Sequence, residues 1–249
     1  IYAEESSFLS RSNNFTLLNT GVWVNNMSYE YGAPVVRQCN FLNTVYGVFM
    51  EHTAGFTVEG NTFTFNEDLE DHPPLFKKVY GLYINGLSEG FKVVENDFTN
   101  LYFNTAVYAS YGTFCNGTGA GLGNLIGYNN YSGMLIGNEV RGQNGDMNNG
   151  LLYICNHHDP GPPGLESGSL SGESIDYKIG GPIRNPQAGV SEDPDVNLPT
   201  GNVSSPAANL EIENTSGITF QYFYDANFSN QTPASGTDLQ LIGLTEVLP

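Results

Sequence analysis

One acidic stretch of the sequence carries residues of the kind that bind calcium. Asp68, Glu70 and Asp71 lie within six residues of one another, together with Glu67 and His72. Carboxylate oxygens are the ligands that Ca²⁺ prefers in proteins. Prolines follow directly, and the acids lack the fixed spacing of a known calcium loop, so we interpret the stretch as a solvated acidic loop. A Ca²⁺ site at these residues is the alternative.

His157 and His158 form the one pair of adjacent histidines, and Asp159 follows them. Imidazole nitrogens bind Zn²⁺ and similar ions. Adjacent side chains point to opposite faces of a strand, so both rings reach one ion only from a loop. We interpret these residues as part of a turn, with a metal site as the alternative.

The acids and bases needed for sugar chemistry are not gathered in the sequence. Glycoside hydrolysis uses two carboxyl groups that flank the scissile bond, and a lyase needs a base beside its acidic groups. The eight basic residues, Arg37, Lys92 and Arg141 among them, are scattered along the chain. We therefore predict no catalytic residue and no cofactor-binding residue.

The three cysteines share one local context. Cys39, Cys115 and Cys155 each directly precede an asparagine, which suggests equivalent positions in a repeat. An odd number of cysteines leaves at least one without a partner inside the chain. We predict three buried thiols that act as small apolar side chains.

An internal repeat is the strongest signal in the sequence. The segment 55–64, GFTVEGNTFT, matches 90–99, GFKVVENDFT, at six of ten positions with an offset of 35. Just upstream, VYGVFM at 45–50 matches VYGLYI at 79–84 with an offset of 34. A fixed period of this size predicts stacked units, as in a solenoid.

Asparagines punctuate the weaker copies of the repeat. Residues 40, 61, 96, 116, 138 and 156 are separated by steps near 20, apart from one step of 35 that contains the acidic stretch. Stacked coils would bring such amides into a column in which they hydrogen-bond along the stack and support left-handed turns. We predict a structural ladder made of Asn40, Asn61, Asn96, Asn138 and Asn156.

The elements within each unit are short strands. They contain Val, Ile, Phe, Tyr and Thr in alternation, and glycine recurs too often for helices. These features predict an all-β, right-handed parallel β-helix, a solenoid with irregular, loop-rich C-terminal coils or a cap. Residues 1–159 form the regular coils in this prediction, and 160–249, rich in Pro, Gly and Ser, form terminal coils or a β cap that leads to a linker.

The overall charge excludes several classes of partner. The net charge is −18, with 8 basic and 26 acidic residues, which opposes binding to nucleic acid and to anionic membranes. No apolar run approaches the length of a membrane-spanning helix, so we expect no membrane insertion.

The repeat resembles the right-handed parallel β-helix regions of secreted bacterial proteins. The later segments GLLYICN, IDYKIGGPIRNPQAG and ITFQYFYD are similar to the end of β-helix regions in large surface proteins of Bacteroidota that are exported by type IX secretion. This resemblance implies an extracellular, cell-surface location. It also implies that the partners are other domains of a longer polypeptide, surface glycans or the secretion machinery.

Several aromatic residues could stack on sugars. Trp23, Tyr46, Tyr80, Tyr83 and Tyr108 lie in the apolar runs, although strand alternation predicts that about half of them point inward. We therefore expect a structural or adhesive segment, that is, a spacer, display scaffold or adhesin stalk. The alternatives are a carbohydrate-active enzyme, either a polysaccharide lyase or a glycoside hydrolase, and a carbohydrate-binding module without catalysis.

Overall fold

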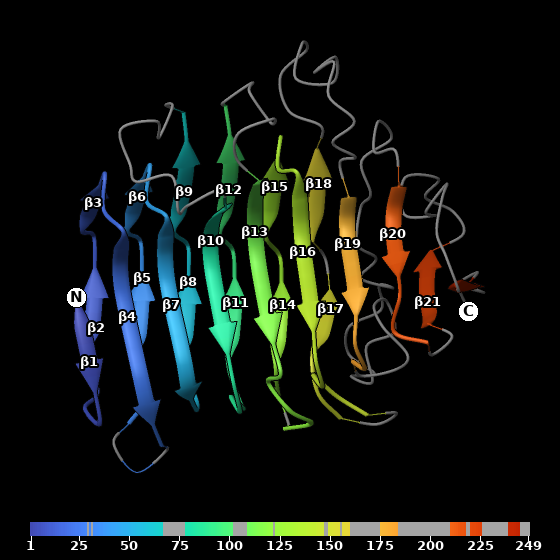
Figure 1. Ribbon diagram of the computed structural model, residues 1–249, viewed down its shortest axis with the longest axis horizontal. Helices are drawn as coiled ribbons and strands as arrows, with labels where there is room; N and C mark the ends of the chain where they lie inside the picture. The colour runs from blue at the N-terminus through green and yellow to red at the C-terminus, as the bar shows by residue number, and fades with distance from the viewer. Residues whose placement is uncertain are drawn as a thin grey trace, which may run out of the picture.

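The chain folds into a solenoid of stacked coils (Figure 1). The computed structural model describes residues 1–28, 30, 32–66, 78–101, 109–121, 123–146, 149–154, 156–159, 175–183, 210–217, 220–225 and 239–244. Regular structure within these ranges is almost entirely β-strand, with no α-helix. Strands of consecutive coils pair in parallel, so the protein is an all-β, right-handed parallel β-helix, as the repeat predicts.

The front layer in Figure 1 is an eight-stranded sheet, which we name sheet A. Its strands, in spatial order, are β1 (Tyr2–Glu4), β4 (Thr20–Met27), β7 (Tyr46–Thr53), β10 (Lys78–Asn85), β13 (Ala109–Asn116), β16 (Ile136–Arg141), β19 (Ile175–Gly180) and β20 (Leu210–Asn214).

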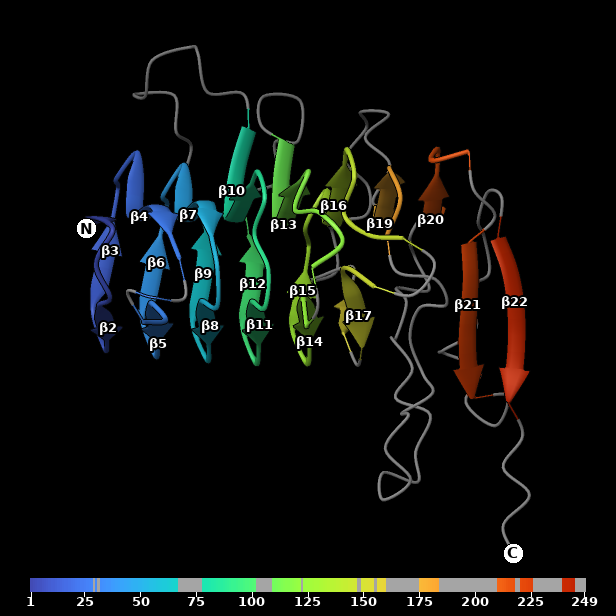
Figure 2. The same cartoon turned by 90° about the horizontal axis from the view of Figure 1, so that it is seen from below.

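Two six-stranded sheets complete the coils. Sheet B contains β2 (Leu9–Arg11), β5 (Val35–Arg37), β8 (Thr57–Glu59), β11 (Lys92–Val94), β14 (Leu125–Gly127) and β17 (Leu152–Ile154). Sheet C contains β3 (Asn14–Thr16), β6 (Asn40–Leu42), β9 (Thr62–Phe65), β12 (Asp97–Asn100), β15 (Asn130–Ser132) and β18 (His157–Asp159). Each coil passes through sheets A, B and C in turn, and Figure 2 shows the coils following one another along the long axis.

The described strands extend beyond residue 159. Strands β19 and β20 continue sheet A, while β21 (Phe220–Asp225) and β22 (Leu239–Leu244) pair in parallel as a separate two-stranded sheet. The division of the chain at residues 159 and 160 stays a prediction.

A column of stacked rings fills the interior beneath sheet C. Phe41, Phe63 and Phe98 stack with ring centroids 4.7 Å apart and planes within 7° of parallel. Phe15 extends this column at one end, and Tyr131 and His158 extend it at the other. The spacing equals the distance between paired strands, so parallel, in-register pairing itself produces the stack.

Glycines on sheet A make room for these rings. A Cβ atom on Gly47 would lie 2.6 Å from the ring of Phe63, and one on Gly81 would lie 2.4 Å from the ring of Phe98. Gly21 and Gly112 face Phe41 and Tyr131 in the same way. Glycine is therefore required at this position of the repeat because the backbone passes directly over an aromatic ring.

Left-handed residues mark the corner after sheet B in the five coils whose corner the structure describes. Positive φ angles of 53 to 61° occur at Ser12, Gln38, Gly60, Glu95 and Tyr128. The side chain that follows Gln38, Gly60, Glu95 or Tyr128 is buried in the interior. Asn61, Asn96 and Asn129 of the asparagine ladder occupy that following position, so the left-handed residue directly precedes the buried amide.

The structure contains a buried asparagine ladder, but some of its residues differ from the predicted ones. The amide Nδ2 atoms of Asn61, Asn96 and Asn129 each donate to the Oδ1 atom of the next coil's asparagine at 2.9 to 3.0 Å, and Asn156 ends the series. Their backbone N–H groups donate to the same oxygens. All four side chains are buried, so the amides satisfy one another and the corner backbone.

Asn40 and Asn138 lie outside this ladder, which corrects the prediction. Cys39, rather than Asn40, aligns with Asn61, because the backbone N–H of Cys39 donates to Asn61 Oδ1. Asn40 is exposed on sheet C and donates to Asn14. Asn138 is buried beneath sheet A, where it accepts from the hydroxyl groups of Tyr131 and Thr113.

The ladder also corrects the predicted number of residues per coil. Successive ladder residues from Cys39 to Asn156 are separated by 22, 35, 33 and 27 residues. The predicted step near 20 residues was wrong, because it compared asparagines from different sheets. The matches at offset 35 are correct, since Val58 pairs with Val93 and Phe63 pairs with Phe98.

Cys39 and Cys115 are free and fully buried, as predicted. Their positions are not equivalent, however. Cys39 lies at the corner between sheets B and C, whereas Cys115 lies within sheet A between Ile84 and Val140. Burial raises the pKa of the Cys115 thiol. Cys155 lies outside the described residues.

Candidate functional site

An aromatic strip covers the outer face of sheet A. Its first column follows one register position across five strands, and its second column follows another position across three. The first column is Tyr2, Trp23, Phe49, Tyr83 and Phe114, and the second is Tyr46, Tyr80 and Tyr111. We refer to these eight residues as the aromatic strip.

The rings of the strip form one continuous network. Tyr46 and Tyr80 stack at 5.3 Å, Tyr80 and Tyr111 at 4.8 Å, and Tyr83 and Phe114 at 4.7 Å. Edge-on contacts join the two columns, as between Tyr80 and Tyr83 at 5.0 Å. Stacked and edge-on pairs at these distances are favourable, so the rings hold one another in place.

The local backbone explains why both columns face outward. Between Tyr46 and Phe49, the glycine and the valine both point inward: Gly47 faces the ring of Phe63, and Val48 is fully buried. Two consecutive inward residues shift the alternation by one, so the aromatic residue on each side of them faces outward. The same pattern repeats at Tyr80–Tyr83 and Tyr111–Phe114. As a result, Trp23, Tyr46, Tyr80 and Tyr83 all lie on the outer face, which corrects the expectation that half of such residues point inward.

Exposure decreases along the strip. Tyr2 is 56% exposed and Trp23 is 38% exposed, Phe49 and Tyr83 are half-buried, and Phe114 is only 4% exposed. The rings near β1 and β4 are therefore accessible to a ligand, while those near β13 are covered.

Burial raises the pKa of the tyrosine hydroxyls in the second column. The shift is upward for Tyr46 and Tyr111, and largest for Tyr80, where neighbouring tyrosines and Glu139 also oppose the anionic form. The pKa of Tyr83 is raised mainly by burial as well. These hydroxyls stay protonated at neutral pH and can donate hydrogen bonds.

A column of amides and carboxylates runs beside the first aromatic column. It contains Glu4, Asn25, Glu51, Asn85 and Asn116, which occupy one register position across the same five strands. Asn85 donates to Glu51 at 3.0 Å, and Asn116 donates to Asn85 at 2.9 Å. We name these residues the polar column.

An ion pair lies at the covered end of the strip. Arg141 Nε donates to Glu139 Oε1 at 2.6 Å, and the guanidinium group lies 5.4 Å from the centroid of the Phe114 ring. This hydrogen bond raises the pKa of Arg141. Glu139 is buried, and its second oxygen has no hydrogen-bond partner among the residues that the structure describes. The pair combines charge attraction with a cation–π contact.

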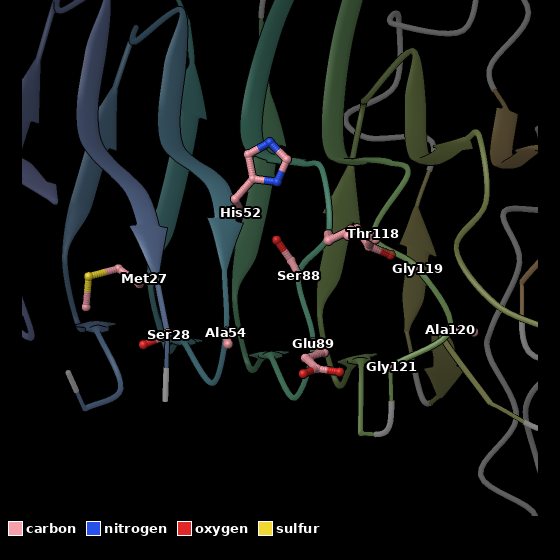
Figure 3. A pocket seen from close by; sticks show the side chains of 11 residues that line it. Met27, Ser28, His52, Ala54, Ser88, Glu89, Thr118, Gly119, Ala120 and Gly121 are labelled. Carbon is pink, nitrogen blue, oxygen red and sulfur yellow. The ribbon is translucent and has the colours of Figure 1, made fainter. Parts of the chain in front are cut away.

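A hollow of about 500 Å³ lies where sheet A turns toward sheet B (Figure 3). Its wall contains hydroxyl groups from Ser28, Ser88 and Thr118, the imidazole of His52 and the carboxylate of Glu89. The rest of the wall is Met27, Ala54, Leu87, Gly119, Ala120 and Gly121. Glycines give the two ionisable side chains their space: a Cβ atom on Gly86 would lie 2.3 Å from the His52 ring, and one on Gly121 would lie 2.2 Å from Glu89 Cβ.

The residues predicted to bind metal are not gathered by the described part of the structure. His157 is exposed on β18, while His158 is buried and stacks on Tyr131 with the ring centroids 4.8 Å apart. Burial, with a smaller contribution from His157, lowers the pKa of His158 to about 3. Asp68, Glu70 and Asp71 lie outside the described residues, as does Tyr108. Within the described ranges, no group of three or more His, Cys, Asp and Glu residues is placed to hold a metal ion.

Sequence reasoning found four residues of the strip and missed Tyr2, Phe49, Tyr111 and Phe114. The aligned segments GVFM, GLYI and GTFC contain the missing signal, since each places an aromatic residue two positions after the inward glycine. Asn129 was also missed; it lies 33 residues after Asn96, close to the period of 35.

Comparisons with protein-family models, curated proteins and solved structures found no match to this chain. No helix among the described residues is long and apolar enough to span a membrane.

Proposed function

We propose that this chain is a rigid, adhesive β-helical segment of a secreted, cell-surface protein, and that the outer face of sheet A binds neutral glycans. The aromatic strip is the observation that carries this proposal. One face of a pyranose ring is lined by C–H groups and packs well against an aromatic ring. An exposed tryptophan and tyrosine in a fixed network are therefore a suitable surface for sugars.

The rigidity of the surface supports adhesion. Paired strands fix the backbone, and ring contacts on both sides fix Trp23, which lies 5.2 Å from Tyr2 and 5.6 Å from Phe49 between centroids. A surface that is already ordered loses little conformational entropy when a ligand binds.

The charge of the chain favours neutral ligands over acidic ones. With a net charge of −18, the protein repels uronic acids and sulfated or phosphorylated glycans at long range. Glu4 and Glu51 place two carboxylates beside the exposed rings, which adds local repulsion.

The extracellular location and the source of the protein are part of the same proposal. The resemblance to type IX exported surface proteins of Bacteroidota, carried by segments such as GLLYICN and IDYKIGGPIRNPQAG, supports both. On this proposal the partners are other domains of a longer polypeptide, surface glycans and the secretion machinery.

Affinity electrophoresis tests the proposal. The protein is run through native gels that contain neutral polysaccharides such as xylan, glucomannan and hydroxyethylcellulose, or acidic ones such as pectin and alginate. We expect at least one neutral polysaccharide to retard the protein, and the double variant Trp23→Ala/Tyr83→Ala to lose this retardation.

Tyr128→Ala is the matched control, because Tyr128 is 48% exposed at the corner after sheet B, away from the strip. Retardation that is absent throughout, or that is lost equally in the control, would contradict the proposal. Release of reducing ends from a retained polysaccharide would instead favour the glycoside hydrolase alternative.

A further inference from the structure

We infer that the glycan is a linear, uncharged, β-linked chain that lies along the solenoid axis, with one sugar residue per coil. This inference rests on the proposed function and specifies the ligand class and its orientation. Four strands, β1, β4, β7 and β10, present the part of the surface that such a chain would occupy.

The repeat distance of the surface supports this orientation. Equivalent residues on neighbouring strands of a sheet are about 4.7 to 4.9 Å apart. That distance is close to the length of one hexopyranose residue in an extended β-(1→4) chain. Because Trp23, Phe49 and Tyr83 occupy one register position, consecutive sugars meet consecutive rings. A chain lying parallel to the strands would meet only one or two coils.

The polar column supplies the hydrogen bonds. It runs beside the first aromatic column at the same spacing, so each coil offers one ring and one amide or carboxylate. Asn85 uses one N–H bond to Glu51 and accepts from Asn116, which leaves a second N–H and a second oxygen lone pair. Equatorial hydroxyl groups at the edge of a pyranose are both donors and acceptors, and they match this set.

The charge of the column restricts the sugar type. Glu4 is exposed and Glu51 is half-buried, and both lie within the column. A carboxylate accepts from neutral hydroxyl groups but repels a uronate at the same place. The ligand is therefore built from neutral hexoses or pentoses.

The decrease in ring exposure along the aromatic strip determines where the glycan chain lies. Tyr2 and Trp23 are the most exposed rings of the strip, and exposure then falls to 4% at Phe114, where Arg141 covers the ring. The glycan thus occupies the strip from Tyr2 to Tyr83, which corresponds to about four sugars at one per coil. The hollow lined by Met27 and His52 flanks the polar column, since these residues follow Asn25 and Glu51 on the same strands, and it leaves room for side branches.

Trp23 is the only tryptophan of the chain, so its fluorescence reports directly on the site. The protein is titrated with cello-, xylo- and manno-oligosaccharides of one to six residues, and with oligogalacturonides as the acidic control. For at least one neutral series, we expect the dissociation constant to fall with each added sugar up to about four and then to level off. The oligogalacturonides are expected not to bind.

The variant Asn85→Ala distinguishes a glycan that lies along the solenoid axis from one that only stacks on the rings. We expect this variant to weaken binding of the tetrasaccharide by roughly three- to tenfold, the effect of one hydrogen bond, and to leave the monosaccharide unchanged. Asn130→Ala is the matched control, because Asn130 is an exposed strand amide in sheet C that bonds to the carboxylate of the previous coil, Asp97.

The outcomes distinguish the inference from the proposed function. If the polysaccharide gels show retention through the strip, but no series gains affinity with length or Asn85→Ala and Asn130→Ala behave alike, the axial arrangement is wrong and glycan adhesion stands. If neither the gels nor the fluorescence titrations show binding, both are wrong.

Discussion

At the scale of single residues, Asn96 shows how the corners of the coils are held. Its amide nitrogen donates to Val58 O, Val94 O and Asn129 Oδ1, and its oxygen accepts from Asn61. Each buried polar group left without a partner costs about 1 to 3 kcal/mol. Replacement by leucine keeps a similar volume but orphans several such groups, so we expect Asn96→Leu to lower the free energy of unfolding by about 3 kcal/mol or more.

Urea denaturation of two variants measures this effect. Asn40→Leu is the control, since Asn40 also bonds to an asparagine of a neighbouring coil but is exposed. A change of less than about 0.5 kcal/mol is expected there, as for most surface substitutions. Equal losses in the two variants would show that the buried ladder contributes nothing special to stability.

His158 gives the protein a predictable dependence on pH. Its pKa is lowered from 6.5 to about 3 in the folded state, so the unfolded chain binds the proton more readily. The stabilisation is complete above pH 6.5 and is lost as the pH falls toward 3, by about 1.4 kcal/mol per pH unit at most.

We expect the free energy of unfolding to fall between pH 6.5 and 5, above the range where most carboxylates titrate. His158→Phe keeps a ring on Tyr131 and should remove this part of the slope, whatever its absolute stability. An unchanged slope in this variant would mean that His158 is not buried in its neutral form.

At the scale of elements, the strands of the three sheets show what the sequence could and could not predict. The match of Val58 to Val93 and of Phe63 to Phe98 was predictable because both coils keep the same residues at the same offset. The outward position of Tyr46 was not, because strict alternation places it on the same side as Val48. The close approach of Gly47 to Phe63 adds an inward residue and shifts the phase, and this approach depends on a contact between distant segments.

The glycine in this motif makes a specific prediction for the strand. In Gly81→Ala, the new Cβ atom would lie 2.4 Å from the ring of Phe98, which cannot move because it is stacked on both sides. Overpacking of this kind costs about 1 to 3 kcal/mol. We expect Gly81→Ala to lower the thermal midpoint clearly, and a second change, Phe98→Leu, to cost much less in the Gly81→Ala background than in the wild type.

This coupling is measured by a double-mutant cycle on the free energies of unfolding. Additive effects of Gly81→Ala and Phe98→Leu would show that the glycine and the ring do not pack against each other as described.

At the scale of the whole molecule, parallel stacking turns one local motif into a surface. A single coil exposes one or two aromatic rings, which is ordinary for a protein surface. Repetition in register aligns them into the aromatic strip and the polar column, so a binding surface arises without any concentrated sequence motif. For this reason, clusters of catalytic or metal-binding residue types in the sequence did not identify the outer face of sheet A.

Selective blocking of one face tests the central claim, that the outer face of sheet A is the binding surface. Glu51→Cys and Glu59→Cys each place a thiol on the same coil with the same change of charge, one in the polar column of sheet A and one on sheet B. Cys39 and Cys115 are fully buried, so a maleimide-linked polyethylene glycol chain couples to the new thiol, and the parent protein corrects for any other reaction.

Retention by the neutral polysaccharide is then compared before and after coupling. The polymer at residue 51 is expected to abolish retention, and the polymer at residue 59 to leave it intact. Retention that survives coupling at 51, or that is lost equally at 59, would contradict the assignment of the binding surface to sheet A.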